Sequence, residues 1–269
     1  MNDDDRSPGM LSGGLVVPGL LGGLLVVYFL LPFVAFLSRA GSVDVVAHLS
    51  SPAARRAVRN SLLTAPVATA IATGLGVPLA YLLARGSFRG KRLLEAAVVL
   101  PLVAPPVVGG VMLLTAVGQF TPLGRVAASL GVPLTDSLLG VVLAQLFVAA
   151  PFVILTARAG FAAIDERLEQ ASRSLGYGPI ATFWRVSLPL ASGAIVVGVT
   201  LTFVRAVGEF GATMMVANNP RTMPTQIWVD FVAGNIDGIV PLTLALLAVT
   251  LAVVFIVQRL GRTPAVVDA

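Results

Sequence analysis

The chain has 269 residues, of which 57% are hydrophobic and only 12% are charged, and its formal net charge is +5. This composition is too apolar for a soluble globular fold and indicates an integral membrane protein. Cysteine is absent from the sequence, which excludes disulfides, thiol nucleophiles and cysteine-ligated metal or iron–sulfur centres. Most arginines lie in short loops beside apolar segments, where the positive-inside rule explains them, so the positive charge does not point to nucleic acid.

Six apolar runs are long enough to cross a bilayer, which takes about 20 residues of helix. They are residues 13–37, 60–84, 96–117, 137–157, 190–217 and 239–257. We therefore predict an all-α integral membrane protein with six transmembrane helices in one domain, residues 13–258, between an N-terminal tail, 1–12, and a C-terminal tail, 259–269. The first run is too long for the apolar region of a signal peptide and follows an acidic start, so we expect it to be retained.

The distribution of Lys and Arg sets the expected orientation. With the N-terminus inside, the inner segments hold eleven basic residues and the outer segments six. This balance favours both termini and the loop 158–189 in the cytoplasm. The cluster of Arg55, Arg56 and Arg59 before the second run goes against this rule.

The third run is rich in helix-breaking residues, namely Pro101, Pro105, Pro106, Gly109 and Gly110. Small residues of this kind are common where membrane helices pack closely. Proline also frees a carbonyl and permits a bend. The segment is therefore either a packing surface or a flexible part of a transport pathway.

The only long polar stretch within the apolar body is 169–189. Apolar residues precede and enter it at spacings of three and four, which predicts one helix face: Phe161, Ile164, Leu168, Ala171 and Leu175. Gly176 is suited to end this helix. Pro179 can open a short second helix, which Pro189 is expected to stop. The pattern predicts a helix–turn–helix elbow at the membrane surface.

The fifth run contains Arg205 and Glu209 in an otherwise apolar helix. Each charge costs about 2.5–3.5 kcal/mol at the bilayer centre on insertion scales, so neither is expected to face lipid. A spacing of four puts both on one helix face, where they can pair. The pair is either a self-satisfied structural feature or part of an anion pathway to which Arg205 adds positive potential.

Residues around this pair are candidates for close packing or gating. Gly208 and Gly211 allow a partner helix to approach. Phe210, Met214 and Met215 are either apolar gate elements or plain packing. Polar residues farther along, Asn218, Asn219, Arg221, Thr222 and Asp237, are expected at the outer surface, where they meet either solvent or a binding protein.

The polar stretch resembles the EAA loop of ABC-importer permeases, through Gln170-Ala171-Ser172, Gly176 and Val186-Ser187-Leu188-Pro189. Gln170 and Ser172 depart from the first and third motif positions, and Glu169 lies one place early. The resemblance implies a type I importer permease whose coupling helix docks on an ATP-binding subunit. The implied coupling residues are Glu169, Gln170, Ala171, Ser172, Gly176, Leu188 and Pro189. The alternative is an ordinary amphipathic cytoplasmic loop.

The segment FVRAVGEFGATMMVANN resembles the fifth-helix signature of molybdate, tungstate and sulfate importer permeases. Phe210-Gly211-Ala212-Thr213 and residues 220–227 are closer to the molybdate and tungstate branch. The resemblance implies a homodimeric permease with two ATP-binding subunits and an extracytoplasmic oxyanion-binding protein. It implies molybdate or tungstate as cargo, with sulfate or thiosulfate as the alternative. The pathway or gate candidates are then Arg205, Gly208, Glu209, Phe210, Gly211 and Met214.

An energy source within the chain is not expected. The only lysine, Lys91, lies in GSFRGKRL, where the phosphate-binding frame is one residue short and Arg92 replaces the hydroxyl residue. ATP and magnesium are therefore assigned to the partner subunit, and no cofactor to this chain. The only histidine, His48, lies near Asp44, and two residues do not make a metal site. The alternative from another class is an autonomous secondary transporter that uses Arg205 and Glu209 for ion coupling.

Overall fold

The structure is a computed structural model that describes residues 10–41 and 43–260, and every element within these ranges is a helix. In chain order the helices are α1 (Met10–Ala40), α2 (Val45–Leu49), α3 (Pro52–Arg85), α4 (Lys91–Val103), α5 (Pro106–Val117), α6 (Pro122–Ser129), α7 (Leu138–Ala162), α8 (Glu166–Ser174), α9 (Pro179–Thr182), the π-helical turn η1 (Phe183–Ser187), α10 (Leu188–Val207), α11 (Gly211–Val216), α12 (Met223–Val232) and α13 (Ile236–Leu260). This all-helical fold confirms the predicted fold class.

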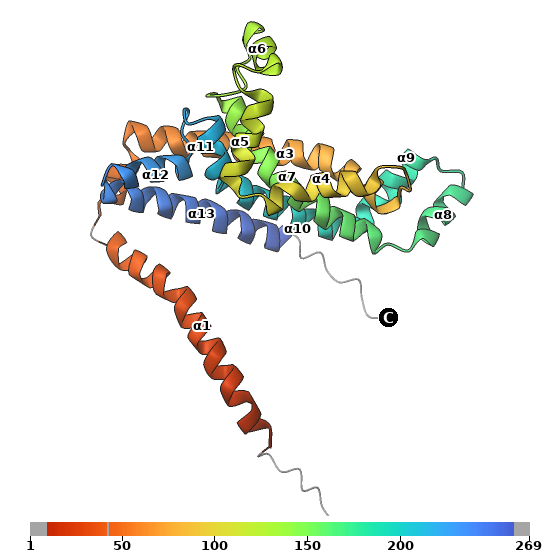
Figure 1. The fold of residues 1–269 in the computed structure, drawn as a ribbon. Coiled ribbons are helices and arrows are strands. Elements are labelled where there is room, and N and C mark those ends of the chain that lie inside the picture. The colour runs from red at the N-terminus through yellow and green to blue at the C-terminus, as the bar shows by residue number, and fades with distance from the viewer. Residues whose placement is uncertain (1–9, 42, 261–269) are drawn as a thin grey trace, which may run out of the picture.

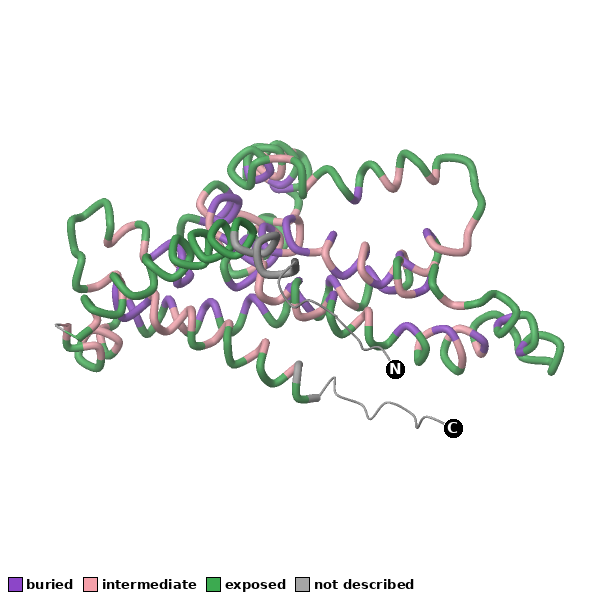
Figure 2. Tube along the Cα trace, turned by 90° about the horizontal axis from the view of Figure 1, so that it is seen from below, coloured by how far each residue is buried: buried purple, intermediate pink, exposed green. Residues whose placement is uncertain are grey.

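The centre of the molecule is formed by α3, α7 and α10, which run side by side along the bundle (Figure 1). Most residues that α3 buries are small, with alanine the commonest, so the neighbouring helices approach closely. Near one end, the rings of Tyr81, Phe161 and Phe183 pack together with centroids 5.0–6.0 Å apart. Figure 2 shows that buried residues concentrate along these central helices. The bundle therefore has a close-packed, small-residue interior.

Five helices are individually long and apolar enough to cross a membrane: Val17–Ala40, Pro52–Arg85, Leu138–Ala162, Pro179–Val207 and Ile236–Val257. A sixth span is possible if Pro106–Val117 and Pro122–Ser129, which meet at a 66° bend, are taken together. Six spans were predicted from the sequence. The bent pair overlaps the third predicted run, 96–117, which is therefore not a single straight helix.

The prediction of one helix over 96–117 was wrong, because this run is divided between α4 and α5. Ala104 lies between them with an extended backbone, φ −70° and ψ 134°. Residues before proline avoid the helical region, and Ala104 and Pro105 each precede a proline. The Pro105-Pro106 pair therefore ends α4 and lets Pro106 start α5.

The prediction of one helix over 190–217 was also wrong. The helix begins earlier than predicted, since it is continuous from Pro179 through η1 into α10. It also ends earlier, because it breaks at Gly208 before α11. Pro189 does not stop the helix. In η1 the N–H of Leu188 donates to the carbonyl of Phe183, five residues back. This wider turn directly precedes Pro189, and proline is accepted in the first turn of α10.

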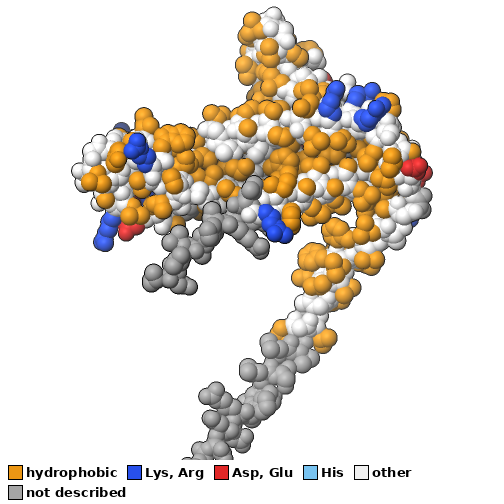
Figure 3. Space-filling view, turned by 180° about the vertical axis from the view of Figure 1, so that it is seen from behind, with side chains coloured by type: hydrophobic (Ala, Val, Ile, Leu, Met, Phe, Trp, Pro, Cys, Tyr) orange, Lys and Arg blue, Asp and Glu red, His pale blue; other side chains and the backbone are white. Residues whose placement is uncertain are grey.

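The outermost element is α1, which stands away from the bundle and has its main contact with α13 (Figure 1). Large apolar side chains are exposed along its described length. The visible face of the bundle is also largely hydrophobic, with Lys and Arg gathered in small clusters (Figure 3). Exposed apolar surface of this extent is expected of a protein surrounded by lipid.

Candidate coupling elbow and intramembrane ion pair

The elbow consists of α8 and α9 at one end of the bundle, opposite the end that carries α2 and α12 (Figure 1). Asp165 starts α8 by accepting a hydrogen bond from the N–H of Arg167 at 2.9 Å. Gly176 follows α8 with φ +88°, the left-handed conformation that favours glycine. The N–H groups of Gly176 and Tyr177 donate back to the last turn of α8, which is the Schellman pattern. The predicted glycine turn and the start of a new helix at Pro179 are both present.

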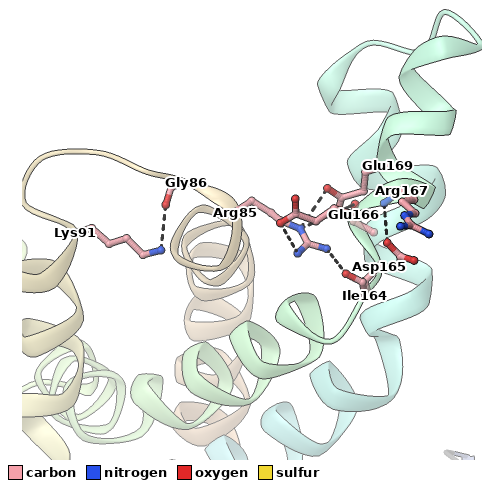
Figure 4. A network of polar contacts seen from close by, with 9 residues as sticks. Arg85, Gly86, Lys91, Ile164, Asp165, Glu166, Arg167 and Glu169 are labelled. Atoms are coloured by element: carbon pink, nitrogen blue, oxygen red, sulfur yellow. Dashed lines mark hydrogen bonds and ion pairs between the residues drawn. The ribbon is translucent and has the colours of Figure 1, made fainter.

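Glu169 is the central residue of the elbow, because its carboxylate is buried and contacts two other elements. Figure 4 shows its side chain beside that of Arg85. Its side chain pairs with Nε of Arg85, at the end of α3, at 3.2 Å. The hydroxyl of Ser187, in η1, donates to Glu169 Oε1 at 2.7 Å. One carboxylate thus joins α8 to the ends of α3 and α10.

Arg85 has two further contacts in this network. Its Nη2 donates to the carbonyl of Ile164 at 2.8 Å, just before α8 begins. Its Nη1 lies 3.6 Å from the carboxylate of Glu166, which is 68% exposed. The guanidinium therefore joins the α3 terminus to the start and the middle of α8. A second link inside the elbow is the 3.0 Å contact between the hydroxyls of Ser172 and Thr182.

The predicted apolar face of the elbow is not where the sequence pattern placed it. α7 ends at Ala162 and α8 begins at Glu166, so Phe161 lies in a different helix from Leu168 and Leu175. Leu168 and Leu175 are exposed, at 48% and 79%. The buried side of α8 is instead polar, because Arg85 and the hydroxyls of Thr182 and Ser187 offer partners to Glu169 and Ser172.

The outer surface of the elbow carries exposed apolar and aromatic side chains. Tyr177, Ile180 and Trp184 are exposed here along with Leu168 and Leu175. Of the other predicted coupling residues, Gln170, Ala171 and Pro189 are exposed, and Leu188 packs partly against the core. Exposed apolar groups held on a rigid polar base are suited to contact a second protein.

The ion pair between Arg205 and Glu209 is present, but not along a single helix face. α10 ends at Val207, and Glu209 lies in the break before α11. The Glu209 side chain is 1% exposed and its Oε1 accepts a hydrogen bond from the N–H of Ala212 at 2.7 Å. Glu209 therefore serves both as the partner of Arg205 and as the acceptor for the first turn of α11.

The glycines near this pair have different roles. A Cβ on Gly211 would lie 3.0 Å from both Pro106 and Val107, so Gly211 lets α5 of the same chain approach α11. A Cβ on Gly208 would meet only the carbonyl of Val204 at 3.4 Å. Phe210 packs on the ring of Trp228 in α12, with centroids 5.5 Å apart. Met214 is partly buried and Met215 is exposed.

Several polar residues of these sites were missed at the sequence level. Arg85 binds Glu169 but comes from a segment that gave no motif. Ser187 also binds Glu169 and lies within the EAA-like stretch, but the sequence gave it no role of its own. Gln145 in α7 and Thr213 in α11 are fully buried, and the described residues offer their side chains no hydrogen-bond partner. A glutamine inside an apolar helix was the available signal for Gln145. Among the described residues, no group of three or more His, Asp and Glu side chains could hold a metal ion.

Comparison with known proteins places this chain in a family. The family described as "Binding-protein-dependent transport system inner membrane component" matches residues 76–263. A probable molybdenum ABC transporter permease protein of Haloferax volcanii is 45% identical and covers 91% of this chain and 90% of its own length. A molybdate/tungstate transport system permease protein of Pyrococcus abyssi is 36% identical, covering 89% and 92%. A probable sulfate transport system permease protein of Chlorokybus atmophyticus is 37% identical, covering 81% and 80%.

Solved structures show the same fold. A bacterial ABC transporter involved in the import of the acidic polysaccharide alginate aligns with a TM-score of 0.72 and 16% identity, covering 94% of this chain and 98% of its own. The family match extends over both the elbow and the ion pair. This chain belongs to the binding-protein-dependent transport system inner membrane components and is the permease subunit of an ABC importer.

Proposed function

We propose that this permease carries molybdate or tungstate across the cell membrane. The observation that carries the proposal is the 45% identity, over nine tenths of both chains, to the probable molybdenum permease of Haloferax volcanii. The Arg205–Glu209 pair supports it, because Glu209 is buried and fixes a guanidinium that is 26% exposed and can offer N–H donors to a passing oxyanion. The second candidate cargo is sulfate, which the 37% identity to a sulfate permease favours. Tetrahedral dianions share charge and hydrogen-bonding demand, so the binding protein is expected to choose among them.

The energy comes from another chain, since permeases of this family work with a separate ATPase that binds ATP and magnesium. We infer that the elbow, within the cytoplasmic loop 158–189, receives this ATPase. The exposed side chains of Leu175, Ile180 and Trp184 would enter its surface. The Glu169–Arg85–Ser187 network would then pass a displacement of α8 to the membrane helices α3 and α10.

We further propose a homodimer in which two copies enclose one pathway lined near Arg205, Gly208, Glu209, Phe210, Gly211 and Met214. The tails 1–12 and 259–269 then lie in the cytoplasm, on either side of the membrane domain 13–258. Binding of ATP and of the loaded binding protein must each favour one of two states, inward-open or outward-open, for transport to be driven.

The test is uptake of radiolabelled molybdate, tungstate and sulfate by proteoliposomes that hold this chain with its ATPase and binding protein. We expect ATP-dependent uptake of molybdate or tungstate that is lost when either partner is left out. Uptake of sulfate alone would replace the proposed cargo by the second candidate. Uptake by this chain without its partners would contradict the coupling scheme and favour a secondary transporter.

A further inference from the structure

A small polar pocket lies at the end of the bundle opposite the elbow, between the first turns of α3 and the segment that leads into α12. Its volume is about 120 Å³, whereas a single water needs roughly 10–15 Å³ on this kind of measure. Its polar lining comes from Arg56 and Asn60 of α3, Asn219 and Arg221 of the connecting segment, and Gln226 of α12. Neither the elbow nor the Arg205–Glu209 pair contributes to it.

The wall of this pocket is fixed by buried amides. Asn60 and Gln226 are 3% and 6% exposed. Asn60 Nδ2 donates to the backbone carbonyl of Arg221 at 2.8 Å, and the Arg221 guanidinium lies 3.4 Å from Gln226 Oε1. Gln226 Nε2 donates to Asp230 at 3.0 Å, which directs its oxygen toward Arg221. One wall of the pocket is therefore fixed by two buried amides that have hydrogen-bond partners, whereas Arg56 and Asn219 of its lining are exposed.

Arg56 and Arg221 both line this pocket, and its lining contains no carboxylate. Arg56 forms no hydrogen bond or ion pair with any residue that the structure describes. The nearest acidic group in the network, Asp230, lies behind Gln226 and is already bonded to it. Two like charges around one cavity repel each other, and an anion between them removes this repulsion. Guanidinium groups bind oxyanions through paired N–H donors, so the matching ligand is a small oxyanion.

Of the three clustered arginines at the start of α3, Arg55, Arg56 and Arg59, only Arg56 lines this pocket. Arg55 and Arg59, four residues apart, line a different surface together with Leu62, Leu63 and Ala245. That surface is apolar, as expected where arginine side chains extend toward a lipid interface. The cluster that goes against the positive-inside rule thus serves two surfaces, and only Arg56 belongs to the pocket.

The pocket and the ion pair are carried by helices that pack on a common hydrophobic cluster. Ala57 follows Arg56, and Ala206 follows Arg205, and both alanines belong to one hydrophobic cluster with Met223 of α12. The α3 turn that carries Arg56 and the α10 turn that carries Arg205 therefore pack on one cluster. This position is suited to an anion that has arrived but has not yet entered the interior.

We propose that this pocket binds one small oxyanion of the cargo class at the end of the permease opposite the ATPase, before the anion passes Arg205. The identity of the anion as molybdate or tungstate rests on the proposed function. The preference for a small oxyanion rests on the pocket alone, because its two unneutralised guanidinium groups and buried amides are independent of the comparisons.

The experiment measures equilibrium binding of radiolabelled tungstate, molybdate and sulfate by dialysis to the assembled complex of this chain and its ATPase, without the binding protein. We expect saturable binding, with Kd raised about tenfold or more by Arg56→Gln and by Arg221→Gln, since each removes charged hydrogen bonds to the anion. Arg55→Gln and Arg59→Gln are the matched controls, because they remove the same charge from residues that line a different surface and do not line this pocket. Only fully assembled complexes, isolated by size exclusion, are compared.

Three results would overturn the proposal: no saturable binding, an equal loss of affinity in all four variants, or anion binding that is unchanged while Arg56→Gln and Arg221→Gln weaken docking of the binding protein. The second would indicate a diffuse positive field, and the third a contact for an acidic side chain of the partner. Failure of the proposed function would give a different result from failure of this proposal. The wild-type system would then take up neither molybdate nor tungstate, while oxyanion binding would still depend on Arg56 and Arg221.

Discussion

Replacing Glu169 by alanine should loosen the elbow from the membrane helices. The change removes the 3.2 Å ion pair to Arg85 and the 2.7 Å hydrogen bond from Ser187. A hydrogen bond to a charged group contributes about 1.5–3 kcal/mol, and breaking a buried ion pair costs about 3–5 kcal/mol. Arg85 keeps its bond to the carbonyl of Ile164 and its side chain is 14% exposed. We therefore expect the lower end of the ion-pair range, about 3 kcal/mol. This free energy corresponds to roughly a hundredfold change in the equilibrium constant for local opening of the elbow.

Two measurements on the reconstituted complex check this value. Hydrogen exchange of amides in 164–189 should become faster by up to about a hundredfold, because local opening of the elbow becomes easier. The number of ATP molecules hydrolysed per ion imported should rise, because movement of the ATPase is passed less completely to α3 and α10. Uptake is the quantity that falls, while ATP hydrolysis continues.

Glu166→Ala is the matched control, since this carboxylate pairs with the same Arg85 but is 68% exposed. Exposed ion pairs contribute about 0–1 kcal/mol, so exchange and coupling should change little. Equal effects of the two substitutions would show that burial of Glu169 does not matter. Unchanged exchange and coupling in Glu169→Ala would refute the role of the network altogether.

Further predictions concern glycines and the intramembrane pair. Gly176→Glu should abolish uptake while membrane insertion and ATP hydrolysis remain, because φ +88° is strained for a side chain by about 1–2 kcal/mol; Gly178→Glu adds the same charge without that strain, and equal loss in both would point to charge instead. Arg205→Ala alone should reduce assembly or uptake more than the double change with Glu209→Ala, since the single change strands a carboxylate that is 1% exposed, and equal loss would contradict the pairing. Gly211→Val should lower the thermal midpoint of the purified chain, because its side chain would enter the first turn of α5, and an unchanged midpoint would show that α5 moves aside.

Much of the architecture follows from local chemistry that the sequence displays. Runs of apolar residues must form helices in a bilayer, so hydropathy located four of the six predicted spans, while the runs 96–117 and 190–217 have other bounds in the structure. Glycine adopts a positive φ without strain and proline has a fixed φ suited to the first turn of a helix, so the turn at Gly176 and the helix start at Pro179 could be predicted. Boundaries were less certain where prolines allowed two outcomes. The Pro105-Pro106 pair ended a helix, whereas Pro189 did not, because the π turn before it accommodated the ring.

Hydropathy could not determine which side of α8 is buried. Spacing put Leu168 and Leu175 on a common face, and an apolar face is normally the buried one. The tertiary structure decided otherwise, because the chain brings Arg85 from 84 residues away and Ser187 from 18 residues away to the carboxylate of Glu169. A buried charge is stable only with partners in place, and partners distant in sequence leave no local signal. The sequence by itself therefore determined most of the long helices and the turn of the elbow, and only the fold decided that the polar side of α8 is held inside and its apolar side is left exposed.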